Sequence, residues 1–249
     1  MIEIPFSIAK KLAKLIPFDL LPQTDIILRV EGLRFAVPSS MLVYAVRNLE
    51  HVVVDRAYTK LASFEPCEHD RVLDVGAALG FYSILAAKRG AYVVAVEPQP
   101  SLAKYALLNA YLNRVNVRLL QIAVSPRPEV EQVTLYVSRN PLTTSLYPSH
   151  AEVHGGISGI LTAKSIDFCK LLALLGPFTL IKIDAECIEL DLLKQCHTIR
   201  RVPKLVIEVH LDCVDTSEVC ALLEERGFKT AVFLDPEEPY QAIVYATTS

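Results

Sequence analysis

Short apolar runs alternate with longer amphipathic segments over the last two thirds of the chain. The apolar runs are rich in β-branched residues and too short for buried helices, so they predict buried strands. The predicted strands are 72–75, 92–96, 117–124, 179–183 and 204–209. The predicted helices between and after them are 80–89, 101–113, 166–175, 188–197 and 217–226. Strands that alternate with helices predict a doubly wound α/β domain with a mostly parallel sheet.

Two stretches depart from this alternation. The last two predicted strands, 230–234 and 242–246, flank the turn-forming residues 235–239, which predicts a hairpin that adds one antiparallel strand at the sheet edge. An extra strand is predicted at 133–137. Residues 138–165 are rich in Ser, Thr, Pro, Gly and His without a strong period, which favours a functional loop or lid.

The first part of the chain has a different pattern. Residues 5–16 carry apolar side chains on one side of a predicted helix, and 25–37 read as a hairpin that turns at Glu31 and Gly32. A helical stretch follows at 40–62. We therefore divide the chain into an N-terminal lobe, 1–65, and a main domain, 66–249.

Composition narrows the class of protein. The chain has 249 residues, of which 52% are hydrophobic, and a formal net charge of −3. These values exclude a disordered chain and argue against a general nucleic-acid binder. No apolar run is long enough to span a membrane, and lysines interrupt the N-terminus where a signal peptide would be apolar. Six cysteines without a C-x-x-C pair predict reduced thiols in a cytoplasmic protein. The oligomeric state is left open.

A glycine loop follows the first strand of the main domain. Residues 72–75 form the predicted strand, and a helix is predicted to begin at Gly80. Between Asp74 and Gly80 the sequence follows the pattern D-x-G-x-x-x-G. Gly76 allows a tight turn, and Gly80 allows a close approach to a ligand. Asp74 lies at the carboxyl end of the strand, where open α/β sheets bind ligands and where an acid can face an ammonium group.

Glu97 ends the second strand, about twenty residues after the loop. An acid there can accept hydrogen bonds from both hydroxyls of a ribose, so the pattern describes an adenosine-type ligand. A dinucleotide site would need a glycine at Ala78 and would disfavour Asp74 beside phosphates. The cationic cofactor S-adenosylmethionine suits the acidic lining better.

Several motifs together resemble the FkbM-type methyltransferase family. Residues 72–77 with 80–83 look like its opening motif, 96–98 like its second and 122–125 like its third, while Asn109 and Asn113 match its asparagine-bearing helix. Residues 180–189 look like its most characteristic stretch, and 207–210 like its fifth-strand motif. The resemblance implies a Rossmann-like class I methyltransferase fold and transfer of a methyl group from S-adenosylmethionine to a hydroxyl of a small molecule or glycan. The cofactor-binding residues predicted are Asp74, Gly76, Ala77, Gly80, Phe81, Glu97, Pro98 and Ala123.

Four polar residues at the ends of the fourth and fifth strands are the candidate catalytic residues. Asp184 and Glu186 follow one strand, and Glu208 and His210 end its neighbour. Neighbouring parallel strands bring all four toward the crevice, where a base can remove the acceptor proton. Lys182 is expected to pair with a carboxylate.

One residue departs from the family pattern, because Cys187 stands where the family has glycine. We expect Cys187 to narrow the acceptor space. No metal is predicted, since no ligand spacing demands one. Two alternatives stay open: a nicotinamide-dependent oxidoreductase, and a catalytically silent adenosyl-binding interaction module.

Overall fold

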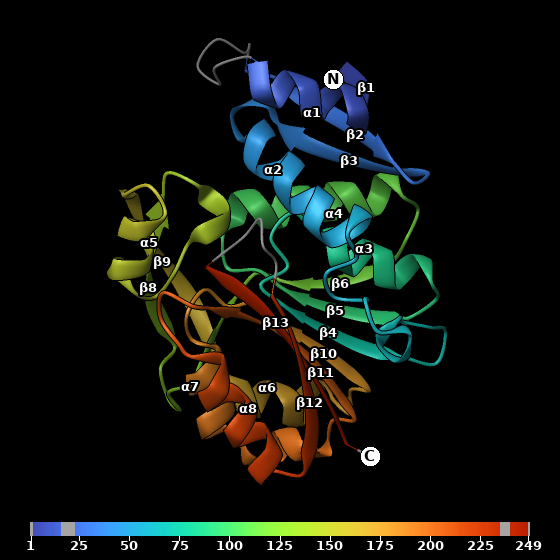
Figure 1. Cartoon of the computed structure of the whole chain (residues 1–249). Helices are drawn as coiled ribbons and strands as arrows, with labels where there is room; N and C mark the ends of the chain where they lie inside the picture. The colour runs from blue at the N-terminus through green and yellow to red at the C-terminus, as the bar shows by residue number, and fades with distance from the viewer. Residues whose placement is uncertain (1, 16–22, 235–239, 249) are drawn as a thin grey trace.

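The computed structural model describes residues 2–15, 23–234 and 240–248. Its centre is a seven-stranded sheet of order β12-β13-β11-β10-β4-β5-β6, with helices on both faces (Figure 1). The five strands β11, β10, β4, β5 and β6 run parallel to one another. The predicted doubly wound, mostly parallel α/β fold is therefore confirmed.

The middle of this sheet is almost wholly apolar. The strands are β4 (Arg71–Val75), β5 (Tyr92–Val96), β6 (Val117–Leu120), β10 (Leu180–Ile183) and β11 (Lys204–His210). Side chains on both faces of β4, β5, β10 and β11 are buried, as expected of parallel strands covered by helices on each side. Their carboxyl ends lie at one edge, so the polar residues that end each strand meet there.

Two layers of helices cover the sheet. Helices α3 (Phe81–Lys88) and α4 (Pro100–Leu112) lie on the face toward the N-terminal lobe, whereas α6 (Phe168–Leu175), α7 (Glu189–Gln195) and α8 (Thr216–Glu225) cover the other face (Figure 1). The short helical segment η6 (His197–Arg201) leads from α7 toward β11. Every helix predicted for this domain is present, with its ends shifted by a few residues.

The C-terminal hairpin is present but its place differs from the prediction. Strand β13 (Gln241–Thr248) lies between β11 and β12 (Phe228–Leu234) and pairs antiparallel with both. The antiparallel strand is thus inserted inside the sheet, and β12 forms the edge. Residues 242–246 are buried on both faces, which explains their continuous apolar run. The predicted turn at 235–239 lies outside the described residues.

Two predictions for the middle of the chain are wrong. The third strand, predicted at 117–124, is two strands: β6 stays in the main sheet, and β7 (Ala123–Ser125) pairs with β9 (Ile157–Asp167) in a small sheet of order β7-β9-β8. Residues 138–165 are ordered, since β8 (Gln132–Ser138) pairs antiparallel with β9, and η5 (Pro141–Thr143) and α5 (Pro148–Val153) lie between them. Most side chains of β9 are half-buried or exposed, so its apolar period is weak in the sequence.

The N-terminal lobe is a three-stranded sheet with helices. Strand β1 (Ile2–Pro5), which was not predicted, pairs parallel with β2 (Asp25–Val30), and β2 forms the predicted hairpin with β3 (Leu33–Pro38). Helix α1 spans Phe6–Leu15, and residue 16, the last of the predicted helix, lies outside the described residues. The helix predicted at 40–62 is shorter and composite. It consists of η2 (Ser39–Met41), α2 (Leu42–Leu49) and the π-helical turn η3 (Glu50–Val54), and the short turn η4 (Ala62–Phe64) follows.

Asn109 on α4 and Asn113 just after it hold the lobe against the main domain. The Asn109 side chain accepts a hydrogen bond from Ala36 N at 2.6 Å and donates to Ala36 O at 3.2 Å and Leu79 O at 3.0 Å. One turn later, Asn113 makes the same pair of bonds with the backbone of Arg34, at 2.9 and 2.6 Å. The two side chains thus satisfy the free edge of β3 as a neighbouring strand would.

The lobe and the main domain also share one apolar core, which includes Phe35 packed edge-on against Phe81. Within the described residues, the helices are too short or too polar to cross a membrane.

Candidate functional site

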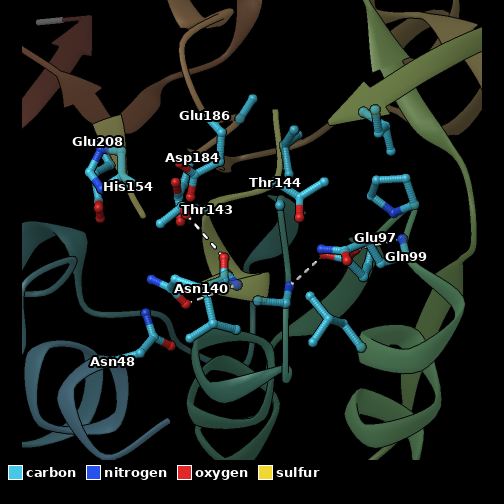
Figure 2. Close-up of a pocket in the computed structure, with 18 of the residues that line it drawn as sticks. Asn48, Glu97, Gln99, Asn140, Thr143, Thr144, His154, Asp184, Glu186 and Glu208 are labelled. Atoms are coloured by element: carbon cyan, nitrogen blue, oxygen red, sulfur yellow. Dashed lines mark hydrogen bonds between the residues drawn. The ribbon is translucent and has the colours of Figure 1, made fainter. Parts of the chain in front are cut away.

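A cavity of about 440 Å³ opens at the carboxyl ends of the parallel strands. Its walls come from the ends of β4, β5, β10 and β11, from α2, and from the segment around η5. In Figure 2, Glu97 and Gln99 lie on one side of it, while Asp184, Glu186, Glu208 and His154 gather on another. The cavity thus lies in the crevice where open α/β sheets bind ligands.

Glu97 dominates one wall of the cavity. Only 4% of its surface is exposed, and its two oxygens accept hydrogen bonds from Ala78 N at 2.9 Å and Gln99 N at 2.7 Å. Burial raises the pKa of Glu97 to about 7, although the two backbone hydrogen bonds oppose that rise. Among the described residues, none makes an ion pair with this carboxylate. Glu97 is therefore a buried acid whose remaining lone pairs can accept hydrogen bonds from a ligand's hydroxyl groups.

The remaining predicted cofactor residues divide into two groups. Gly76, Pro98 and Ala123 line the cavity beside Glu97. Ala77, Gly80 and Phe81 do not line it. The close approach that Gly80 allows is to Ala106 of α4, which a Cβ at residue 80 would meet at 3.1 Å, and not to a ligand.

Gly76 is required by the packing of the turn itself. Its φ is +74°, and a Cβ at this position would lie 1.8 Å from the backbone oxygen of Asp184, the residue after the neighbouring strand β10. The glycine turn after β4 and the residue after β10 are therefore in close contact. Only glycine permits both the left-handed conformation and this approach.

Asp74 lies inside the protein and not on the cavity wall. Its exposed fraction is 1%, Ser83 Oγ donates to its Oδ2 at 2.6 Å, and Lys182 Nζ lies 3.3 Å from its Oδ1. Lys182 also lies 3.1 Å from Asp184 Oδ2, so the lysine bridges two carboxylates. This pairing agrees with the expectation for Lys182. The structure does not bring Asp74 to the surface where a ligand's ammonium group would sit.

Asp184, Glu186 and Glu208 form the opposite wall. Burial raises the pKa of Asp184 to about 7, with Glu208 and Glu186 adding to the rise and Lys182 opposing it. Glu208 shifts the other way: burial alone would raise its pKa, but His51 and Tyr58 lower it to about 2. The Tyr58 hydroxyl donates to Glu208 Oε2, and His51 Nε2 lies 3.4 Å from the same oxygen. The wall thus combines acids of different basicity.

His210 lies behind this wall and is fully buried. Its Nε2 is 3.2 Å from Glu186 Oε2, and its Nδ1 is 3.2 Å from Glu189 Oε1. Burial alone would lower the pKa of His210, but Glu186 and Glu189 raise it well above its usual value. His210 is therefore close to the cavity but does not line it. A direct contact with an acceptor is not available to it in this conformation.

Sequence reasoning missed several residues of the site. Asn48 and His51 come from the N-terminal lobe and line the cavity, and Tyr58 reaches Glu208 from the segment after η3. Asn140 and Thr143 line it from the region interpreted as a loop. Their positions far from the strand ends give no motif. The only signal was the unexplained polar composition of 138–165.

Cys187 corrects two expectations. It forms a disulfide with Cys213, and Cys169 forms one with Cys196, so the prediction that the thiols are reduced is wrong for these four residues. Cys187 also does not narrow the cavity, because it does not line it. Its φ is +86°, in the left-handed region that favours glycine, which explains why the family carries glycine at this position.

Comparison with known sequences points to one family. The family model described as "Methyltransferase FkbM domain" matches residues 74–230, which is more than half of the chain. This range includes both acidic walls of the cavity and the glycine turn. A search of curated proteins gave no match.

Solved structures share the fold. A Pyrococcus abyssi tRNA (uracil-54, C5)-methyltransferase in complex with S-adenosyl-L-homocysteine is similar with a TM-score of 0.51 and 13% identity, covering 91% of this chain and 45% of that chain. Magnesium protoporphyrin IX methyltransferase from Synechocystis PCC 6803, with bound SAH, is similar with a TM-score of 0.50 and 12% identity. The match covers 84% of this chain and 85% of that chain. Aeropyrum pernix fibrillarin, with natively bound S-adenosyl-L-methionine, is similar with a TM-score of 0.50 and 14% identity. The match covers 90% of this chain and 82% of that chain.

At these identities the likeness concerns the fold, which is that of class I methyltransferases. Together with the match over residues 74–230, it identifies the chain as a member of the FkbM methyltransferase domain family.

Proposed function

We propose that this protein transfers a methyl group from S-adenosylmethionine to a hydroxyl oxygen of a small molecule or glycan. The single observation that carries the proposal is the position of Glu97. It is a buried acid without an ion-pair partner among the described residues, and it lines the cavity at the end of the second strand of a methyltransferase fold. Ribose hydroxyls would supply the hydrogen-bond donors that its oxygens can accept.

The chain's residues fit this cofactor in two respects. Gly76, Pro98 and Ala123 form a small-residue wall beside Glu97, which leaves room for an adenosine group. The acids on the opposite side suit a cationic sulfonium. When bound, the cofactor supplies an electrophilic methyl group. The bond from this methyl carbon to sulfur would break as the bond to the acceptor oxygen forms, and the electron pair of the broken bond would stay on sulfur.

The protein's part in the reaction is to align the acceptor and to receive its proton. We assign the proton to the carboxylate of Asp184, which lines the cavity and is held in place by Lys182. Glu186 and Glu208 would orient the acceptor from the same wall, and His210 would act through Glu186. Lys182 keeps Asp184 fixed through a buried ion pair, so the base needs little rearrangement before reaction.

The experiment compares two variants in binding and turnover. Glu97→Ala should weaken S-adenosylhomocysteine binding by about 1–3 kcal/mol, because charge-assisted hydrogen bonds are lost. Asp184→Asn should keep nearly normal affinity but lose turnover by about 10²–10⁴-fold. Isothermal titration calorimetry and methyl transfer to acceptors in a cell extract measure the two effects. Stabilisation by NADH in place of S-adenosylhomocysteine would contradict the proposal and favour an oxidoreductase.

A further inference from the structure

Two buried imidazole rings converge on one carboxylate oxygen next to the cavity. His150 Nε2 lies 2.6 Å from Glu186 Oε2, and His210 Nε2 lies 3.2 Å from the same atom. The three residues come from α5, from the turn after β10 and from the end of β11, so they are far apart in the sequence. Both rings are fully buried, and Glu186 lines the cavity.

The other nitrogen of each ring is held by its own carboxylate. His150 Nδ1 lies 2.8 Å from Asp212 Oδ2, and His210 Nδ1 lies 3.2 Å from Glu189 Oε1. Carboxylates in these positions accept a hydrogen bond from Nδ1–H and leave the Nε2 lone pair free to bind. Histidine ligands of metal ions are oriented in this way in most protein sites. The two Nε2 atoms are therefore aimed at a common point beside Glu186.

A second observation marks the same point. Among the described residues, His210 Nε2 and Asp184 Oδ1 are buried polar atoms that make no hydrogen bond. They lie 3.9 Å apart. Buried polar groups are normally satisfied, so two unsatisfied atoms that face each other indicate a missing partner. An ion bound by His210 Nε2 would satisfy this atom next to Asp184.

We propose that His150, His210 and Glu186 bind a divalent transition-metal ion. The candidate atoms of His150, His210 and Glu186 all lie within 4.8 Å of one another. Two imidazole nitrogens with carboxylate oxygens favour ions such as Zn²⁺, Mn²⁺, Fe²⁺ or Co²⁺ over Mg²⁺ or Ca²⁺. The ligand spacing, 36 and 24 residues, follows no short motif, which is why the sequence did not predict the site.

The place of the ion suggests what it does. Asp184 and Glu186 line the cavity, so an open coordination position would face the acceptor. A hydroxyl bound there loses its proton more readily, because the cation stabilises the developing alkoxide. This role rests on the proposed methyl transfer, whereas the binding of the ion does not.

A titration with Co²⁺ tests the site in the absence of cofactor and acceptor. The full chain is freed of metal with a chelator, and Co²⁺ is added while its visible absorption is recorded. We expect one equivalent to bind. Glu186→Gln and His150→Gln should weaken binding at least about tenfold, and the orienting variant Asp212→Asn should weaken it about ten- to a hundredfold. Glu152→Gln and His197→Gln, which change exposed residues of the same types, should bind as the wild type does.

Three results would overturn the metal site. One is that no stoichiometric Co²⁺ binds, which would mean that protonated histidines alone fill the cluster. Another is equal binding by Glu186→Gln and Glu152→Gln when circular dichroism shows both to be folded. The third is a thiolate charge-transfer band, which would show that the Cys187–Cys213 disulfide is reduced and that these cysteines hold the ion. Calorimetry with S-adenosylhomocysteine on the same preparations reports on the proposed function separately.

Discussion

At the scale of single residues, Glu97 links burial to ligand binding. Its pKa is raised to about 7 because the side chain is buried without a cation beside it. In the proposed complex the ionised form would accept hydrogen bonds from ribose hydroxyls, and protonation would remove part of this capacity. At a pH below about 7, binding of the ligand would therefore be coupled to the loss of a proton from Glu97.

Binding of S-adenosylhomocysteine should therefore depend on pH with a definite sign. The dissociation constant for S-adenosylhomocysteine should fall as pH rises through about 7 and level off above it, with a limiting slope of about tenfold per pH unit on the acid side. Glu97→Gln cannot ionise and should bind more weakly with a flatter pH profile. Calorimetry between pH 5.5 and 8.5, a range of about 1.5 units on each side of the pKa, measures both. A wild-type profile as flat as that of Glu97→Gln would remove Glu97 from the ligand contact.

Gly76 shows that one residue type can be required for two separable reasons. Gly32, at the tip of the β2–β3 hairpin, has nearly the same φ, +78°, but a Cβ added there would meet no other atom within 4 Å. Gly32→Ala should cost about 1 kcal/mol of unfolding free energy, the conformational penalty alone. Gly76→Ala adds a collision with the Asp184 backbone and should cost more than about 4 kcal/mol. Urea denaturation measures both, and equal losses would show that the turn relaxes away from β10.

At the scale of elements, asparagine side chains from α4 and its C-terminal end form hydrogen bonds with the backbone of β3, as a neighbouring strand would. Asn109 is fully buried and makes all three of its bonds with backbone groups of Ala36 and Leu79. Its removal leaves these groups unsatisfied inside the protein, and each such group costs about 1–3 kcal/mol. This junction positions α2, and so it places Asn48 and His51 at the cavity.

Asn109→Ala should therefore destabilise the protein by about 3 kcal/mol. It should also increase hydrogen exchange at the Ala36 amide before the main sheet opens. Asn116→Ala, at an exposed position shortly after α4, should change stability by less than about 0.5 kcal/mol. Mass spectrometry of exchange and urea denaturation separate the two. Unchanged protection of the β3 backbone in Asn109→Ala would show that apolar packing alone holds the lobe.

The elements also show what the sequence could predict. Strands β4, β5, β10 and β11 are buried on both faces, so their apolar runs and the polar residues at their ends were visible in the sequence. The split of 117–124 into β6 and β7 was not visible, because the apolar positions run on through both strands. The pairing of β8 with β9 was not visible either, because few of their side chains are buried. The position of β13 inside the sheet depends on which strand its edge meets, and local sequence does not encode this.

At the scale of the whole molecule, the site is assembled from distant parts of the chain. Glu97, Asp184 and Glu208 were predictable because strand ends meet in one crevice. Tyr58, His51 and His150 were not, since each reaches the acidic wall from the N-terminal lobe or from α5 through tertiary packing. Asp74 looked like a ligand contact by position, but the structure pairs it with Lys182 and Ser83 inside the protein.

The central claim is that this cavity transfers a methyl group from S-adenosylmethionine to an oxygen. The most direct test incubates the protein with cofactor that carries a deuterated methyl group and with a small-molecule and glycan extract, and then seeks labelled products by mass spectrometry. We predict a product with the label on a hydroxyl oxygen, formed by the wild type and nearly absent with Asp184→Asn. Cofactor binding without any labelled product, or equal labelling by Asp184→Asn, would contradict the account.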